Sequence, residues 1–101
     1  MSKIFIFKHF KINFKMSLID FIEDYYLPIM KIDKNIPCIQ SMFLAIKNGD
    51  KKSVEKSYYE LIEYIKNQVS VDIYPVINLY FNRMRYEIYT SFDLNLQYVY
   101  F

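Results

Sequence analysis

Hydrophobic residues recur about every three to four positions through most of the chain, which is the period of an amphipathic α-helix. The clearest stripe lies in residues 51–69 and contains Val54, Tyr58, Leu61, Ile62, Ile65 and Val69. Similar stripes begin near Ser17, after Pro37 and after Asp72. The pattern therefore predicts a helical body over residues 17–90 that contains about four helices.

Residues that begin or end helices separate these stripes. Pro28 lacks a backbone N–H and restricts the residue before it, so we expect the first helix to end there. Pro37 fits the first turn of the second helix, and Gly49 can adopt the left-handed conformation that closes it. Asp50 can cap the third helix. With Pro75 in the first turn of the fourth helix, these residues set the predicted helix boundaries.

Residues 39–81 also resemble the helix–turn–helix of tetratricopeptide and pentatricopeptide repeats. The residues that carry the resemblance fall near the small-residue and turn positions of such a hairpin, and they are Ala45, Gly49, Asp50, Val54, Tyr58 and Leu61. Asp72, Ile73 and Tyr74 fall near the start of a next repeat. The similarity spans less than half of the chain, and arrays of such repeats need several copies to be stable. It implies a generic helical hairpin and assigns no residue a function.

Residues 1–16 differ from the helical body because they carry several lysines and no acidic residue. Phe10, Ile12 and Phe14 alternate there with polar residues, which is the period of a half-exposed strand. A leader-like targeting segment is the alternative interpretation, although the arginines typical of mitochondrial leaders are missing. We therefore expect either a basic strand or a leader in this part of the chain.

Residues 91–101 return to a period of two after the last helix. One face of the alternation holds Phe92, Leu94, Leu96, Tyr98 and Tyr100. This pattern predicts a terminal strand that pairs with the strand at the other end or with another chain, because a two-stranded ribbon is marginally stable alone. The predicted fold class is therefore mainly α, with about four helices and a short strand at each terminus, in a single small domain over residues 1–101.

The composition indicates an AT-rich gene rather than a particular activity. Residues with AT-rich codons, such as Lys, Ile, Asn, Phe and Tyr, are abundant, whereas the chain contains one Gly and three Pro. Such a bias is typical of organelle genomes and of AT-rich viruses, phages or parasites. It favours an intracellular location, with the mitochondrion as the first hypothesis.

Few residues with catalytic or metal-binding chemistry are present. His9 and Cys38 are the chain's single histidine and cysteine, so a structural zinc site, which uses four such ligands, is not expected. Gly49 is the single glycine, which excludes glycine-rich phosphate and dinucleotide loops. The acidic cluster in residues 20–24 fits the positive end of a helix dipole better than acid–base catalysis. We therefore predict a protein that is not an enzyme, uses no cofactor or metal, and lacks the ~20-residue apolar run of a transmembrane helix.

Aromatic residues form 20% of the chain, which exceeds what one small interior is expected to hold. Tyrosine and arginine are favoured at protein interfaces, since both combine contact area with hydrogen-bond donors. The candidate interface residues are Phe10, Phe14, Tyr59, Tyr64, Arg83, Arg85, Tyr86, Tyr89, Tyr98 and Tyr100. We therefore expect a non-catalytic accessory or structural subunit of a larger protein assembly, with a mitochondrial respiratory or ribosomal complex as the first hypothesis.

Two other functions fit the same features. A small viral or phage protein that binds and inhibits a host factor would be equally aromatic and non-catalytic. An RNA-binding module ranks third, because Lys8, Lys11 and Lys15 offer phosphate contacts, while the net charge of +2 is weaker than such domains usually carry. A plain helix pair between Arg83 and Glu87 is the alternative to an interface role for Arg83.

Overall fold

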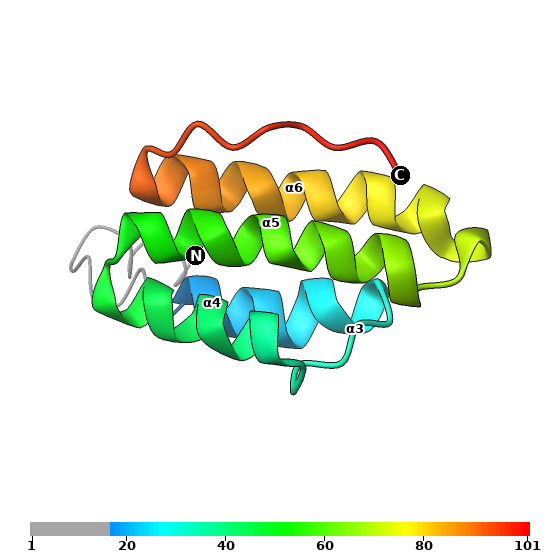
Figure 1. The fold of residues 1–101 in the computed structure, drawn as a ribbon, viewed down its shortest axis with the longest axis horizontal. Helices are drawn as coiled ribbons and strands as arrows, with labels where there is room; N and C mark the ends of the chain where they lie inside the picture. The colour runs from blue at the N-terminus through cyan, green and yellow to red at the C-terminus, as the bar shows by residue number, and fades with distance from the viewer. Residues whose placement is uncertain (1–16) are drawn as a thin grey trace, which may run out of the picture.

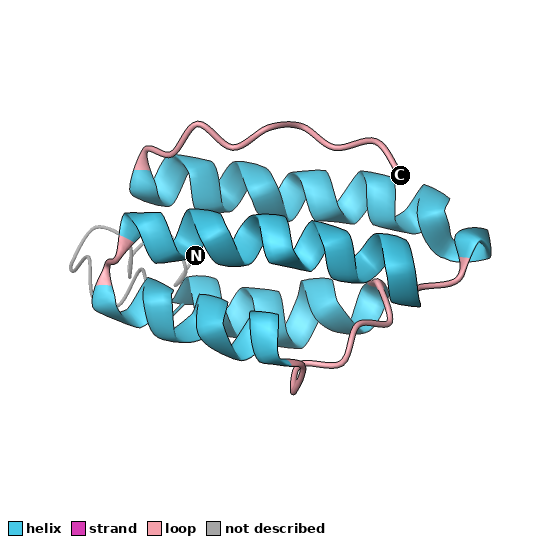
Figure 2. Ribbon diagram, viewed as in Figure 1, coloured by secondary structure: helices cyan, strands magenta, loops and turns pink. Residues whose placement is uncertain are grey.

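The computed structural model describes residues 17–101, and this part of the chain is mainly helical (Figure 1, Figure 2). Helical rods lie side by side with their long axes roughly aligned (Figure 1). The first rod covers residues 17–29, and it is followed by α4 (Pro37–Asn48), α5 (Lys51–Gln68), the short 3₁₀ turn η2 (Val71–Ile73) and α6 (Tyr74–Phe92). The predicted mainly α fold is therefore confirmed for the described residues.

The first rod contains a π-helical turn, η1 (Ile22–Tyr26), followed directly by α3 (Leu27–Ile29). The sequence predicts an end at Pro28, and the helix ends one residue later, at Ile29. A π turn is wider than an α turn, so it gives the proline ring room beside the preceding turn. The chain leaves the helix at Lys31, whose φ of 58° is left-handed.

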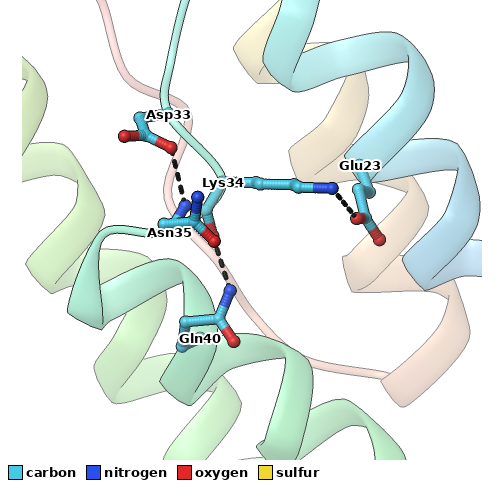
Figure 3. A network of polar contacts seen from close by, with 5 residues as sticks. All are labelled: Glu23, Asp33, Lys34, Asn35 and Gln40. Atoms are coloured by element: carbon cyan, nitrogen blue, oxygen red, sulfur yellow. Dashed lines mark hydrogen bonds and ion pairs between the residues drawn. The ribbon is translucent and has the colours of Figure 1, made fainter.

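Side chains hold the loop between α3 and α4 against the first rod. Figure 3 shows Lys34 reaching from this loop to Glu23, with 2.8 Å between Nζ and the carboxylate Oε2. The carbonyl of Lys34 also accepts a hydrogen bond from the side chain of Gln40 in α4. Within the loop, the carboxylate of Asp33 accepts from the amide N–H of Asn35. This network joins the first rod, the loop and α4.

A tight turn joins α4 and α5 into a hairpin. Gly49 closes α4 with a left-handed φ of 68°, and the side chain of Asp50 caps α5 by accepting from the amide and the hydroxyl of Ser53. The amide N–H of Asp50 donates to the carbonyl of Ala45, which is the long bond of a Schellman motif. Pro37 occupies the first turn of α4. The turn and the start of the hairpin therefore agree with the sequence prediction.

Buried apolar side chains fill the space between the rods. Fully buried members come from every rod and include Ile22, Ile39, Met42, Ile46, Leu61, Ile65, Ile77, Phe81 and Met84. Two tyrosines, Tyr26 and Tyr58, are buried with them, and the Tyr58 ring stacks on Phe81 with 5.3 Å between centroids. Much of the aromatic content is therefore used inside this small domain.

The described residues contain no β-strand. The predicted strand within residues 1–16 lies outside them. Residues 91 and 92 still belong to α6, and residues 94–101 run back along that helix without regular secondary structure (Figure 1). The predicted strand over residues 91–101 is therefore not formed, because helix side chains rather than a second strand bind its backbone. We call residues 94–101 the returning segment.

Candidate protein-interaction surface

Two asparagines of α6 hold the backbone of the returning segment. The carboxamide of Asn82 donates to the carbonyl of Val99 over 2.6 Å and accepts from the amide N–H of the same residue over 3.0 Å. Asn78 makes the corresponding pair of bonds with Phe101. Each carboxamide therefore satisfies both backbone groups of one residue, much as a neighbouring β-strand does.

Side chains of α5 and α6 also bind the earlier part of the returning segment. The hydroxyl of Tyr58 donates to the carbonyl of Gln97 over 2.5 Å, and the hydroxyl of Tyr59 accepts from the amide N–H of Gln97 over 3.3 Å. A guanidinium N–H of Arg85 donates to the carbonyl of Leu96 over 3.1 Å. The segment is therefore attached to both helices through its backbone.

Apolar side chains of the returning segment pack against the helices. Leu96 is buried, and Val99 and Phe101 are half-buried against the core. The Phe101 ring lies edge-on to Phe81 with 5.4 Å between centroids, and 5.9 Å from the ring of Tyr74. The segment is therefore part of the packed fold.

The direction of the side chains changes within the returning segment. The sequence pattern places Tyr98 and Tyr100 on the same face as Leu96, but the structure leaves these tyrosines 65% and 82% exposed. Val99, predicted on the opposite face, packs inward. The bonds from Asn82 to the Val99 backbone, rather than the apolar alternation, decide which residues face the helix here.

The exposed tyrosines of residues 17–101 all lie on α6 or on the returning segment. Tyr86 and Tyr89, in the second half of α6, have ring centroids 5.9 Å apart. Tyr98 and Tyr100 complete the group. The name tyrosine–arginine surface is used below for Arg83, Arg85, Tyr86, Tyr89 and Tyr98, which a shared cavity and ring contacts connect; Tyr100 is exposed farther along the returning segment.

A cavity of about 400 Å³ lies within this surface. Its wall includes Leu79, Arg83, Arg85, Tyr86, Glu87 and Tyr98. The guanidinium of Arg85 lies 5.7 Å from the centroid of the Tyr98 ring, within the range of a cation–π contact. The cavity is therefore formed by α6 and the returning segment, together with Tyr26 of the first rod.

Arg83 and Glu87 do not form the ion pair that their spacing predicts. The carboxylate of Glu87 instead accepts a hydrogen bond from the hydroxyl of Tyr26 over 2.9 Å. The one ion pair among the described residues joins Lys34 to Glu23. Arg83 is exposed at the cavity wall. Its charge is therefore available to a group that enters the cavity.

Burial changes the titration of two phenols beside this surface. Desolvation, reinforced by the hydrogen bond to Glu87, raises the pKa of Tyr26 well above its usual range. Desolvation also raises the pKa of Tyr58, although the positive charge of Arg85 acts against this rise. Both hydroxyls therefore remain protonated donors at neutral pH.

The other candidate interface residues are not part of this surface. Tyr59 and Tyr64 are half-buried and pack against the core. Phe10, Phe14 and the lysines considered for RNA binding lie outside the described residues. Cys38 is half-buried, and burial raises the pKa of its thiol, which disfavours the reactive thiolate.

Residues 17–101 contain no group of three His, Cys, Asp or Glu side chains arranged to hold a metal ion. No helix in this part of the chain combines the length and the apolar character needed to cross a bilayer.

Sequence reasoning missed the roles of Asn78 and Asn82. These residues lie four positions apart and directly follow Ile77 and Phe81, which belong to the apolar stripe of α6. The sequence signal for these roles was a pair of side-chain amides, four residues apart, next to a buried stripe. Such amides require hydrogen-bond partners when they are buried. The signal was weak, since asparagine is common in a chain with this codon bias.

No known family model matches this chain, and neither curated proteins nor solved structures provide a significant match. Its function is therefore inferred from the residues and contacts described above.

Proposed function

We propose that this protein is a non-catalytic subunit that binds other proteins within a larger assembly. The observation that supports the proposal is the location of the exposed tyrosines, which all lie on α6 and the returning segment within residues 17–101. Tyr26 and Tyr58 are buried in the core, and the other aromatic rings of residues 17–101 are at least half-buried, so these four tyrosines are its exposed rings. They lie in the same part of the fold as a cavity and an arginine without an ion-pair partner.

Tyrosine and arginine suit such a surface for physical reasons. A tyrosine ring offers a large, rigid contact area, and its hydroxyl can replace a lost bond to water. An arginine offers several donors in a planar group that also stacks on rings. Residues of these types carry much of the binding energy at protein interfaces. The tyrosine–arginine surface therefore has the composition of a binding centre.

The charges of the cavity indicate the chemistry of the partner. Arg83 and Arg85 line it together with Glu87, so two positive charges and one negative charge give the wall a net positive charge. An acidic side chain flanked by apolar groups fits this wall, because the carboxylate meets Arg83 while its neighbours meet Leu79 and Tyr86.

We further propose a mitochondrial multi-subunit complex, respiratory or ribosomal, as the assembly. Support for this location comes from the residue composition and its codon bias, and not from the fold. The composition fits a viral or phage origin as well, so identification of the partner distinguishes these settings.

Site-specific photocrosslinking in the native source tests the proposed function. A photoreactive amino acid at the position of Tyr86 should capture one protein at a fixed stoichiometry, whereas the same group at the exposed position of Leu44 on α4 should not. Arg83→Glu should abolish the capture, because it places a negative charge against the partner's acid. Lys47→Glu, a charge reversal on the exposed side of α4, is the matched control and should leave it unchanged. Equal capture from both positions, or none from position 86, would contradict the proposal.

A further inference from the structure

The helix α6 carries a second apolar stripe on its exposed side. Val76, Leu79 and Tyr86 are 38%, 54% and 58% exposed, whereas Met84 on the core side of the same helix is completely buried. Together with Arg83, the three exposed residues follow one another at intervals of three, four and three, which is the a and d repeat of a coiled coil. The name α6 seam is used below for Val76, Leu79, Arg83 and Tyr86.

The α6 seam runs into the cavity described above. Leu79, Arg83 and Tyr86 all belong to the wall of that cavity. Tyr26 of the first rod and Tyr98 of the returning segment line it as well, so elements other than α6 border the seam. A segment that lies along the seam would therefore contact α6 and reach these two rings.

The hydrogen-bonding groups of α6 show which kind of segment suits the seam. An extended chain needs partners for its backbone N–H and C=O groups. The carboxamides of Asn78 and Asn82, which could serve as such partners, are already bound to the returning segment. The seam itself offers an extended backbone only the guanidinium of Arg83 and the hydroxyl of Tyr86. A helix satisfies its backbone internally, so a helix fits an apolar seam of this spacing better than an extended chain.

The charge at the middle of the seam indicates one feature of this helix. Arg83 is exposed and forms no ion pair, since the one ion pair of residues 17–101 joins Lys34 to Glu23. A second copy of α6 would not neutralise Arg83, because the seam contains no acidic residue. A parallel pair would place two Arg83 side chains together, and an antiparallel pair centred on the seam would place Arg83 against Leu79. A different helix with an acidic residue at the facing position complements the charge.

We propose that the α6 seam binds an amphipathic helix of another protein, which presents apolar residues at heptad spacing and an acidic residue that faces Arg83. This inference rests on the proposed function and names the kind of segment that the partner presents. The apolar residues of the incoming helix cover Val76, Leu79 and the ring of Tyr86, and the acidic residue forms the ion pair that Arg83 lacks within its own chain.

Photocrosslinking from two positions of the seam tests this inference. Leu79 and Tyr86 are seven residues apart, which corresponds to about 10.5 Å along α6. A photoreactive amino acid is placed at one position or the other in the full chain, and mass spectrometry identifies the crosslinked residue of the captured protein. We expect the two crosslinked residues to be about seven apart in its sequence, because a helical partner also advances by about 1.5 Å per residue. An extended partner advances by about 3.3 Å, so crosslinks about three residues apart would overturn the inference.

The outcomes of this experiment separate the inference from the proposed function. Capture of one protein with crosslinks about three residues apart would leave the proposed function standing and remove the helix. Failure to capture any protein from position 86 would remove the proposed function and the inference together. Capture of a second copy of this chain from both positions would overturn the inference as well, because such a pair leaves Arg83 without a counter-charge.

Exchange of the two facing charges provides an independent test, with a synthetic peptide of the captured segment as the probe. Arg83→Glu in the full chain should weaken binding of this peptide by roughly tenfold or more, and a lysine in place of the peptide's facing acid should restore most of the loss. The peptide should also gain helical circular dichroism when it binds. Leu79→Asp should abolish binding, whereas Leu44→Asp, at a similarly exposed position on α4, is the matched control and should leave it unchanged. Loss of binding that the lysine peptide does not restore would overturn the proposed pairing with Arg83.

Discussion

The α4–α5 hairpin and the unit formed by α6 and the returning segment are stabilised in different ways. In the hairpin, apolar residues at helical spacing, such as Ile46 and Leu61, are completely buried, and the side chain of Asp50 caps α5 at the turn. In the other unit, asparagine and arginine side chains of α6 bind the backbone of a segment that has no secondary structure, and Tyr58 of the neighbouring α5 binds it too. The hairpin is therefore stabilised mainly by the burial of apolar side chains. The unit of α6 and the returning segment depends on directional hydrogen bonds as well.

The two regions should therefore respond differently to substitutions. Burial is non-directional and is shared by many neighbours, so a loss in the hairpin weakens the whole fold. The returning segment depends on a few donors and acceptors at fixed positions. Removal of one of these hydrogen-bonding groups should release the segment while the helices stay folded, because parts of a protein can open locally without global unfolding.

A cavity in the hairpin should have the largest effect. Leu61→Ala should lower the free energy of unfolding by about 2–5 kcal/mol, because a fully buried leucine is lost and its site cannot collapse completely. Chemical denaturation followed by circular dichroism measures the change. Leu44→Ala, at a position 60% exposed on α4, is the control and should change the stability little. Similar losses from both substitutions would contradict the assignment of the hairpin core.

Removal of one asparagine carboxamide that binds the returning segment should have a smaller and local effect on stability. Asn82→Ala removes the two bonds to Val99 and should lower the local stability of the returning segment by about 1–3 kcal/mol, because the Val99 backbone groups lose their partner. Hydrogen exchange should show faster exchange at the Val99 amide and little change at the amide of Ile62. Asn67→Ala, on the exposed side of α5, is the matched control. Equal loss of protection in α5 would show that the segment and the hairpin open together.

Alkaline pH should produce the smallest effect. Burial raises the pKa of the Tyr58 phenol above its ordinary value of 10.0, so the folded state keeps the proton where the unfolded state releases it. The associated stability is complete below pH 10 and is lost as pH rises through the higher folded value. Tyr58→Phe should therefore reduce the decline of stability between about pH 9 and 11, as measured by denaturation at each pH. Tyr98→Phe, at an exposed position, should preserve the decline, and the same flattening from both variants would rule out the buried phenol as its cause.

The sequence was most informative where local chemistry decides the structure. Gly49 and Asp50 have few alternatives as helix-ending and helix-capping residues, and both act as predicted. At Pro28 the sequence located the end of the helix to within one residue, but nothing in the local pattern predicted the π turn at Ile22–Tyr26. For the site, exposure of Tyr86 and Tyr89 agrees with an interface role, whereas Tyr59 is half-buried beneath the returning segment. A helical period cannot distinguish an exposed ring from one that a distant segment covers.

By itself, the sequence determined that the body is helical and where the α4–α5 turn lies, because helical period, capping and left-handed glycine act over a few neighbouring residues. Only the tertiary structure decided that residues 94–101 bind to helix side chains instead of forming a strand, and that Tyr98 and Tyr100 point outward. The physical reason is distance along the chain. The hydrogen bonds that orient these residues come from Asn78, Asn82 and Tyr58, and a local pattern carries no information about such remote partners.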